Sequence, residues 1–372
     1  MELFSFIYLF VFLLQRVLSK YVEYAMTYIG GSIYSQVGIG TPPLAITSRI
    51  CLLSNYSHFS SNAYHYKSSK TAEVFDEKEI MVEEALIKAN QMSDIIKIYG
   101  HPYGEFRYSF FLFQSQFSNK ADCLALGYTK ENEDFSLVHQ LKKKELINEL
   151  SFTLFNMTKI IYGELPIEIK RNLSLVSQCE MNQNIPFWNC KLNAILIENK
   201  KIEIDDFIFF QSTHRTIFVP KYFIGLLKQK IFNKYIKKGI CSEIEIYNSI
   251  SSFMIRCNCS AIENFPSLSF LFGNYKFVLN KEKLFEYSIN DNCFFNLRES
   301  TYSDKKWIVG TSFYSQYTTT FNYEKDSISF FVQSQIHNSE KDNIQTIYTI
   351  TIILLSINIY FLCYIKKYKV KG

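Results

Sequence analysis

The chain has 372 residues, of which 48% are hydrophobic, and a net charge of +5. It is long enough to bury one large core or two moderate ones, and an aromatic content of 17% favours strands over long surface helices and excludes a disordered chain. The four lysines after residue 365 account for most of the charge and leave +1 for the rest, so no basic surface for nucleic acid is expected.

An apolar run of about a dozen residues opens the chain, at positions 3–14. The run is too short to span a bilayer comfortably and is typical of the core of a signal peptide, although residue 2 is acidic where a positive charge is usual. We therefore expect a signal peptide over residues 1–19, with an uncleaved membrane anchor as the alternative.

Two hairpins are predicted in the first third of the chain. Residues 33–37 alternate apolar and polar side chains, as a half-buried strand does, and glycines and prolines at 38–43 mark a turn. The second strand of this hairpin leads into Cys-Leu-Leu-Ser at residues 51–54. Residues 95–108 contain two strand-like runs around a Gly/Pro turn and predict the other hairpin.

Helices are predicted at three places. Residues 71–91 are rich in Glu and Lys and indicate a short helix or a surface insertion. Leucines at near-helical spacing predict an amphipathic helix over residues 135–150. Residues 221–238 predict a helix with apolar side chains on one side, namely Phe223, Leu226, Leu227 and Ile231.

A run of 22 uncharged residues, 344–365, matches the length that a transmembrane helix needs. Four lysines follow it at once, and the positive-inside rule places the tail, residues 366–372, in the cytosol. These lysines also argue against a glycolipid anchor. With a signal peptide in front, the chain is expected to be a type I membrane protein of the secretory pathway or cell surface, with its globular part lumenal or extracellular.

Six segments carry distinctive residues in a fixed order: Ile-Gly-Thr-Pro-Pro at 39–43, Ala-Asp-Cys-Leu-Ala-Leu-Gly-Tyr at 121–128, the Trp-containing strand at 186–197, the stretch 209–220, Ser-Ala-Ile-Glu-Asn-Phe-Pro at 260–266, and Trp-Ile-Val-Gly-Thr-Ser-Phe at 307–313. In this order they resemble pepsin-like aspartic proteases, and together the resemblance covers about residues 34–330. The resemblance implies an all-β fold of two lobes with a cleft between them. We expect the lobes at residues 20–171 and 172–338.

The resemblance also places the two catalytic aspartates, and this chain has neither. In the family one aspartate lies nine residues after the first proline of the turn, which gives Cys51, and the other lies nine residues before a proline, which gives Gln211. Aspartic proteolysis needs two carboxylates that share a proton, whereas an amide cannot exchange a proton at a useful pKa. Leu53 and Thr213 replace glycines that the family keeps in these loops. The sequence therefore predicts a catalytically inactive homologue, a pseudoenzyme.

Several other residues could in principle supply substitute chemistry. Asp205 and Asp206 lie five or six residues before Gln211, which is well over 15 Å along a strand, and are expected to be turn residues. Cys51 with His58 or His214 gives a possible Cys–His nucleophile pair, and Cys257-Asn-Cys259 a possible metal site. We favour none of these and expect no cofactor and no metal.

The resemblance implies a site that binds a peptide without catalysing its cleavage. Tyr99 and Gly100 resemble the Tyr-Gly pair of the family's flap, and Ser54 ends the first loop, although an ordinary hairpin is the alternative because residues 101–103 differ from the family. The chain is thus expected to be a membrane-anchored homologue that binds an extended peptide or protein in its cleft. The alternatives are an active endopeptidase with carboxylates not yet placed, and a surface protein whose cleft is closed.

Eight of the nine cysteines lie in the presumed ectodomain, where disulfides are favoured. The resemblance implies the pair Cys259–Cys293, while Cys241–Cys257 and Cys179–Cys190 follow from proximity and order alone. Cys51 and Cys123 remain, and the family's fold makes them neighbours, so we expect a disulfide through the former active site, with two separate buried thiols as the alternative. Four N-glycosylation sequons are present, at Asn55, Asn156, Asn172 and Asn258.

Overall fold

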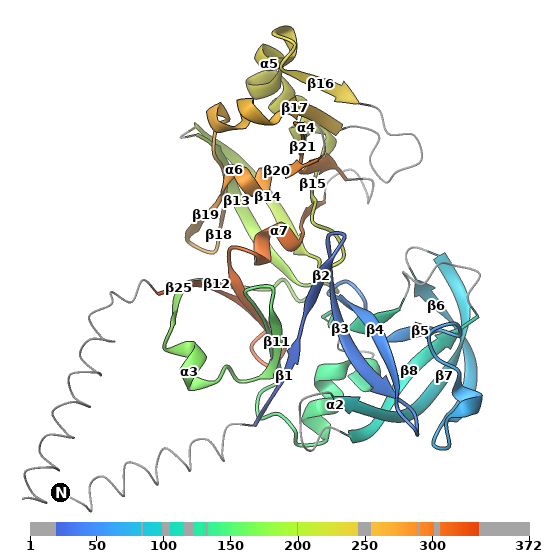
Figure 1. Cartoon of the computed structure of the whole chain (residues 1–372). Helices are drawn as coiled ribbons and strands as arrows, with labels where there is room; N and C mark the ends of the chain where they lie inside the picture. The colour runs from blue at the N-terminus through green and yellow to red at the C-terminus, as the bar shows by residue number, and fades with distance from the viewer. Residues whose placement is uncertain are drawn as a thin grey trace, which may run out of the picture. The chain divides into compact units, whose positions relative to one another are not determined.

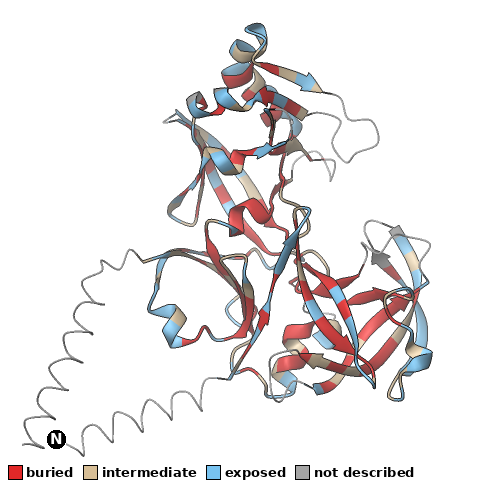
Figure 2. Cartoon of the chain, viewed as in Figure 1, coloured by how far each residue is buried: buried red, intermediate tan, exposed pale blue. Residues whose placement is uncertain are grey.

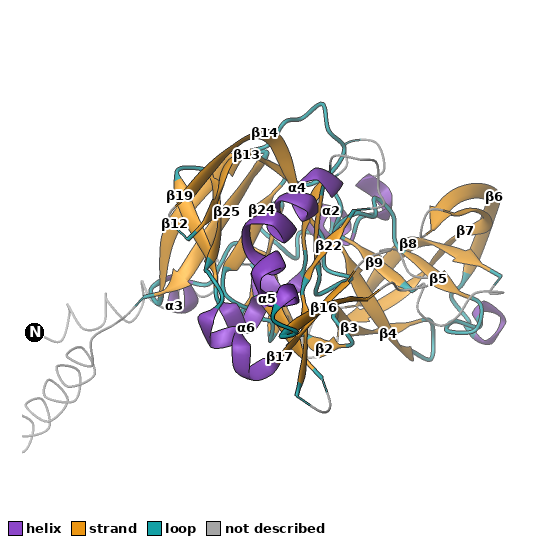
Figure 3. Ribbon diagram, turned by 90° about the horizontal axis from the view of Figure 1, so that it is seen from above, coloured by secondary structure: helices purple, strands orange, loops and turns teal. Residues whose placement is uncertain are grey.

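The structure is a computed structural model that describes residues 20–82, 85–98, 105–114, 122–128, 130, 133–198, 200–244, 254–288, 291–300 and 306–334. The expected signal peptide, the apolar run 344–365, the basic tail, and Tyr99 and Gly100 lie outside these residues. In the part of the chain that is described, no helix is both long and apolar enough to cross a membrane. The fold is mostly β and is built from several sheets (Figures 1 and 3).

The chain divides into two compact units, of which the first comprises residues 1–167 and 175–332 and the second residues 168–174 and 333–372. Within the second, the exposed Asn172 donates a side-chain hydrogen bond to the Glu168 carbonyl at 2.9 Å, and the Ser174 and Ser334 hydroxyls are 2.8 Å apart. All the residues considered below for chemistry belong to the first unit.

An eight-stranded sheet is formed from the first third of the chain. Its order is β2 (Thr27–Ile29), β3 (Ser32–Ile39), β4 (Leu44–Cys51), β9 (Cys123–Ala125), β5 (His58–Ser60), β8 (Glu105–Phe113), β7 (Ala85–Ile98) and β6 (Glu73–Val82). The short helix considered for residues 71–91 is therefore wrong, because residues 73–82 form β6 and residues 85–91 belong to β7, with which β6 pairs. Residues 73–79 are all exposed, so the edge strand β6 shows little of the alternation that marks a half-buried strand.

A six-stranded sheet combines strands from the two halves of the sequence. Its order is β1 (Tyr21–Ala25), β11 (Lys159–Gly163), β10 (Ser151–Phe155), β24 (Thr318–Asn322), β25 (Ser327–Gln333) and β12 (Leu173–Glu180). β10 and β24 pair antiparallel at the centre, with Phe152 opposite Phe321 and their rings stacked at 4.8 Å. This pair joins the first half of the chain to the second.

The second half of the chain forms two further sheets. The seven-stranded sheet runs β19 (Tyr275–Leu279), β18 (Leu268–Phe272), β13 (Asn189–Ile197), β14 (Lys200–Phe210), β23 (Trp307–Val309), β15 (Ile217–Val219) and β22 (Leu297–Glu299). The four-stranded sheet runs β16 (Cys241–Ile244), β17 (Met254–Asn258), β21 (Asn292–Phe295) and β20 (Phe285–Tyr287).

One strand order occurs twice. The first repeat, β3-β4-β9-β5-β8, has the same order and the same directions as the second, β13-β14-β23-β15-β22. In each, an antiparallel hairpin is followed by a strand that returns parallel to the hairpin's second strand, which gives the parallel pairs β4–β9 and β14–β23. The chain leaves β4 and β14 through short loops, which we name the first loop (residues 51–54) and the second loop (residues 211–214).

The helices are short and lie at the edges of the sheets. The longest helical stretch, α4 (Lys221–Leu227), the π-helix η4 (Lys228–Phe232) and α5 (Asn233–Lys237), confirms the helix predicted over residues 221–238. The helix predicted over 135–150 is shorter than expected, because α2 ends at Lys143 and a positive φ at Glu145 follows. The remaining helical turns are α3 (Ile167–Lys170), α6 (Lys281–Leu284), α7 (Thr311–Tyr314), η1 (Tyr66–Ser68), η3 (Glu133–Phe135) and η5 (Cys259–Asn264).

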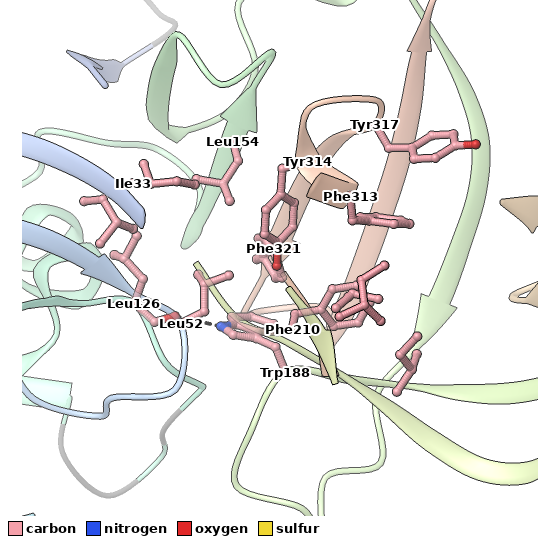
Figure 4. Close-up of a cluster of buried hydrophobic side chains, with 14 of the residues drawn as sticks. Ile33, Leu52, Leu126, Leu154, Trp188, Phe210, Phe313, Tyr314, Tyr317 and Phe321 are labelled. Carbon is pink, nitrogen blue, oxygen red and sulfur yellow. Dashed lines mark hydrogen bonds between the residues drawn. The ribbon is translucent and has the colours of Figure 1, made fainter. Parts of the chain in front are cut away.

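The buried side chains form one large apolar core that lies between the sheets (Figure 2). Figure 4 shows the part of it around Trp188, which is fully buried and donates its indole N–H to the Leu126 carbonyl at 2.7 Å. Leu52, from the first loop, and Phe210, at the end of β14, belong to the same cluster. Both loops are therefore anchored by the core that they leave.

Candidate functional site

The two loops occupy equivalent places in the two repeats. The fourth residue of each loop presents its carbonyl to a glycine on the returning segment: a Cβ on Gly127 would lie 2.4 Å from the Ser54 oxygen, and one on Gly310 would lie 2.2 Å from the His214 oxygen. Only glycine allows so close an approach. Counting back three residues from Ser54 and His214 gives Cys51 and Gln211, so these two residues occupy equivalent places in the two repeats.

A single hydroxyl joins the two loops. Ser212 donates from Oγ to the Ile50 carbonyl and accepts from the Leu52 backbone N–H at 3.3 Å. Leu52 is the second residue of its loop, as Ser212 is of the other, but has no hydroxyl to return the contact. The link is therefore made by Ser212 alone of these two residues. The sequence analysis did not predict it. The sequence feature that could have indicated it is that Ser212 is polar whereas Leu52, at the same position of the other loop, is not.

A disulfide takes up the first position of the first loop. Cys51 is bonded to Cys123 on β9, across the parallel pair β4–β9, with a Cα–Cα distance of 5.9 Å. Both residues are buried. The disulfide expected from the sequence is present, and no thiol or thiolate remains at this position.

Gln211 takes up the first position of the second loop. Its backbone N–H donates to the Val309 carbonyl at 3.0 Å, and the residue is 1% exposed. Its side-chain Nε2 is buried and finds no hydrogen-bond partner among the described residues. The side chain at this position is a neutral amide. Neither loop therefore supplies a carboxylate that could activate water or hold a shared proton.

The carboxylates nearest in sequence do not replace the lost pair. Asp205 and Asp206 were expected to be turn residues, and this expectation is wrong. They lie within β14, where its register against β13 shifts. Asp205 forms an ion pair with Lys191, and Asp206 accepts from the Phe207 N–H at 2.7 Å. Five or six residues of strand separate them from Gln211, about 17 Å or more.

Asp122, which precedes the disulfide-bonded Cys123, accepts a hydrogen bond from the backbone. Its Oδ1 accepts from the Ser60 N–H at 2.6 Å, which ties the start of β9 to β5. Burial raises the pKa of this carboxyl, against the hydrogen bonds from Ser60 and the charge of Arg49, which lower it.

A buried carboxylate that the sequence reading missed holds the Gly-Thr-Pro-Pro turn. Asp94, on β7, accepts hydrogen bonds from the hydroxyls of Tyr64 and Thr71, and the Thr41 hydroxyl lies 2.9 Å from that of Thr71. Burial and the bond to Asp94 raise the pKa of the Tyr64 phenol. Asp94 is fully buried, and an acid within an apolar strand run was the signal that could have pointed to it.

Thr311 and Asn322, on the returning segments of the second half, are each held by a local hydrogen bond. Thr311 donates from Oγ1 to the Gly31 carbonyl at 2.9 Å. Asn322 donates from Nδ2 to the Glu149 carboxylate at 2.8 Å, where a second carboxylate would be repelled. Neither residue carries chemistry.

The alternative catalytic and metal sites are not assembled. Cys51 is held in a disulfide and cannot act as a nucleophile with His58 or His214. The His58 Nδ1 lies 3.2 Å from the Tyr56 carbonyl, and the His214 ring packs against Phe218. Cys257 and Cys259 belong to different disulfides, and no group of three or more metal-ligating side chains occurs within the described ranges.

The other three disulfides also follow the expected pairing: Cys179–Cys190, Cys241–Cys257 and Cys259–Cys293. Of the sequon asparagines in the first unit, Asn258 is exposed, whereas Asn156 and Asn55 are half-buried. The Asn156 side chain accepts from the Thr318 hydroxyl at 3.0 Å, and the Asn55 Oδ1 is buried beside Gly127.

Two small apolar clusters lie outside the main core, one at the β8–β7–β6 end of the eight-stranded sheet and one in the second repeat. The first consists of Ile80, Ala89, Phe111 and Phe113, with Tyr56, Ile87 and Phe135 packed against it. The second consists of Phe209, Phe218 and Ile308, with Ile185, Phe187 and Phe207 against it. Each contains a residue close in sequence to its loop, Tyr56 after the first and Phe209 before the second. Ser54 adds no free hydroxyl, because it donates to the Tyr56 carbonyl at 2.9 Å.

The family model for eukaryotic aspartyl proteases matches residues 114–332, which is more than half of the chain. The matched range contains Cys123, the whole second repeat and Gln211, while the Gly-Thr-Pro-Pro turn and Cys51 precede it. No curated protein matches the chain.

Proposed function

Because the chain belongs to the eukaryotic aspartyl protease family, we propose that it is a catalytically inactive, membrane-anchored member that binds an extended peptide or protein segment in the cleft of a bilobal pepsin-like domain. The observation that carries the proposal is the pair of residues at the two equivalent loop positions. One is a cysteine in a disulfide and the other is a glutamine. Neither can hold the proton that two aspartates share.

The loss of chemistry leaves the binding framework in place, which favours a binding role. The two glycines that press on the loops are kept, and the hydroxyl of Ser212 still joins the loops. The apolar cluster beside each loop offers half-buried aromatic side chains, which are well suited to contact a bound peptide. In this role the domain holds a segment without cutting it.

Anchoring in a membrane of the secretory pathway is supported by the sequence runs at both ends and by the disulfides. Four disulfides are typical of an oxidising compartment. The apolar run 344–365 has the length of a membrane span, and the lysines after it favour a cytosolic tail. The peptide-binding face would then lie in the lumen or outside the cell, where the sequons could carry glycans.

A proteolysis assay tests the loss of activity. The full chain, purified in mild detergent, is incubated with a mixture of peptides at acidic pH, with and without a statine-type inhibitor, and the products are read by mass spectrometry. We expect no cleavage that the inhibitor suppresses. Inhibitor-sensitive cleavage by the wild-type chain that persists in a Gln211→Ala variant would show carboxylates acting elsewhere and would refute the proposal.

A further inference from the structure

We infer that the aromatic cluster beside the second loop selects partner segments that carry an acidic side chain next to a large apolar one, with Lys306 as the group that recognises the carboxylate. This inference rests on the proposed function and names the chemistry of the bound segment. It rests on a comparison of two lysines near the same cluster. Lys191 forms an ion pair within the chain, whereas Lys306 has no ion pair among the described residues.

The cluster is placed by the parallel pair β14–β23. Phe209 lies opposite Ile308 in this pair, and Phe218 comes from β15 on the other side of β23. Because neighbours in a strand point to opposite faces, Phe209 and Ile308 lie on the face opposite to Phe210 and Trp307, which enter the main core. The cluster is therefore separate from the main core, and its half-buried members Ile185, Phe187 and Phe207 form a small apolar surface near the end of the strand that leads into Gln211.

Lys306 lies over this surface and precedes β23 directly. Its Nζ is 5.7 Å from the centroids of both the Phe187 and the Phe209 rings. The side chain is half-buried, and its described contacts are these two rings, with no ion pair among the described residues. A partly desolvated ammonium with aromatic faces below it is stabilised by them, but these rings do not neutralise its charge as a carboxylate among the described residues would.

Lys191, the second lysine near the same cluster, shows the contrast. Its Nζ lies 5.0 Å from the Phe207 ring, but it also forms an ion pair with Asp205. Its charge is already neutralised within the chain, and its side chain is more exposed. Of the two lysines, only Lys191 has a carboxylate partner among the described residues, so Lys306 is the one expected to receive a partner's carboxylate and Lys191 is a matched control of the same residue type.

The spacing fits an extended segment that passes the loops. Gly310, the glycine under the second loop, lies four positions after Lys306. Four positions of extended chain span about 13 Å. If the bound segment is also extended, the residue that carries its acidic side chain would lie about four positions from the residue of the segment that contacts the loops. Its neighbouring apolar side chain would contact the half-buried Phe187 ring.

A peptide selection tests this. The full chain, immobilised in mild detergent, is offered a phage-displayed library of random dodecapeptides, and selected peptides are sequenced. We expect enrichment of Asp or Glu beside aromatic or aliphatic residues. The most enriched peptide is then synthesised with its Asp→Asn or Glu→Gln counterpart, and the acidic form should bind about tenfold more tightly by fluorescence anisotropy.

Variants assign the preference to one side chain. Lys306→Met keeps the apolar stem and should bring the affinity ratio to about one, Lys306→Arg should retain the ratio, and Lys306→Glu should shift selection to basic residues. Lys191→Met should behave as the wild type. Selection without an acidic preference, or a preference that survives in Lys306→Met, overturns the inference alone. The absence of any enriched sequence overturns the proposed peptide binding as well.

Discussion

In the first repeat the chain leaves β4 through a cysteine that is bonded to the strand beside it, whereas in the second it leaves β14 through a glutamine whose backbone N–H donates to Val309 and whose side-chain Nε2 has no partner among the described residues. The strand order, the glycine under each loop and the closeness of its approach are nearly the same. The backbone of the repeat thus does not depend on which side chain stands at the first loop position. The two positions are held in different ways, one by a covalent bond to the neighbouring strand and the other by a backbone hydrogen bond.

The largest effect is expected from the disulfide of the first repeat. It closes a separation of 72 residues, and the loop-closure model assigns such a link about 4 kcal/mol of stability. A Cys51→Ala/Cys123→Ala variant of the full chain should lose about that much free energy of unfolding in chemical denaturation. The control Cys179→Ala/Cys190→Ala opens a separation of 11 residues and should lose about 3 kcal/mol. A smaller loss from the first pair than from the control would show that the first loop is held by packing instead.

The glycines under the loops test whether the repeats are equivalent. Gly127→Ala and Gly310→Ala each force a Cβ into a backbone carbonyl and should each cost about 3 kcal/mol, the upper end for an overpacked site. Gly225→Ala is the matched control, because a Cβ there meets no atom within 4 Å and the residue lies in α4. It should stabilise the chain by about 1 kcal/mol. Costs that differ widely between Gly127 and Gly310 would contradict the equivalence.

The one-sided link between the loops should have a smaller effect. Ser212→Ala leaves the buried Leu52 N–H without its acceptor and should cost about 2 kcal/mol in the free energy of unfolding. Ser212→Thr keeps the hydroxyl and should cost clearly less. If the two variants lose the same stability, the hydroxyl contributes nothing and the loops are joined by apolar contacts alone.

The smallest effect concerns the sheet that both halves share. Burial raises the pKa of Glu149, but hydrogen bonds from Lys325, Asn322 and Ser151 outweigh it, and the net shift is below the ordinary value of 4.5. A carboxyl whose pKa is lowered on folding contributes stability above its unfolded pKa and loses it as the pH falls through the folded one. Glu149→Gln should therefore cost about 1 kcal/mol at pH 7 and nothing at a pH below both values. Denaturation curves at the two pH values measure this, and a cost that is independent of pH would exclude the charge as its cause.

Features with fixed spacing could be read from the sequence. Pro42 and Pro220 located the two loop positions, and the apolar side of residues 221–238 gave the helix there. Features set by tertiary contacts could not. The strand β6 has a charged, exposed sequence and is held by pairing with β7, while Asp94 and Ser212 act through partners distant in the chain. Asp205 and Asp206 looked like turn residues because nothing local marks the shift in register of β14.

The four-stranded sheet has a consequence for oxidative folding. Its register puts Cys257 opposite Cys241 on one neighbouring strand and opposite Cys293 on the other. Cys257 is therefore within reach of two thiols, although the native partner of Cys293 is Cys259. Once this sheet has formed with its thiols reduced, a bond between Cys257 and Cys293 would leave Cys241 and Cys259 unpaired. Thiol–disulfide exchange must then correct the pairing, so the yield of native protein should depend on the redox buffer and on disulfide isomerase.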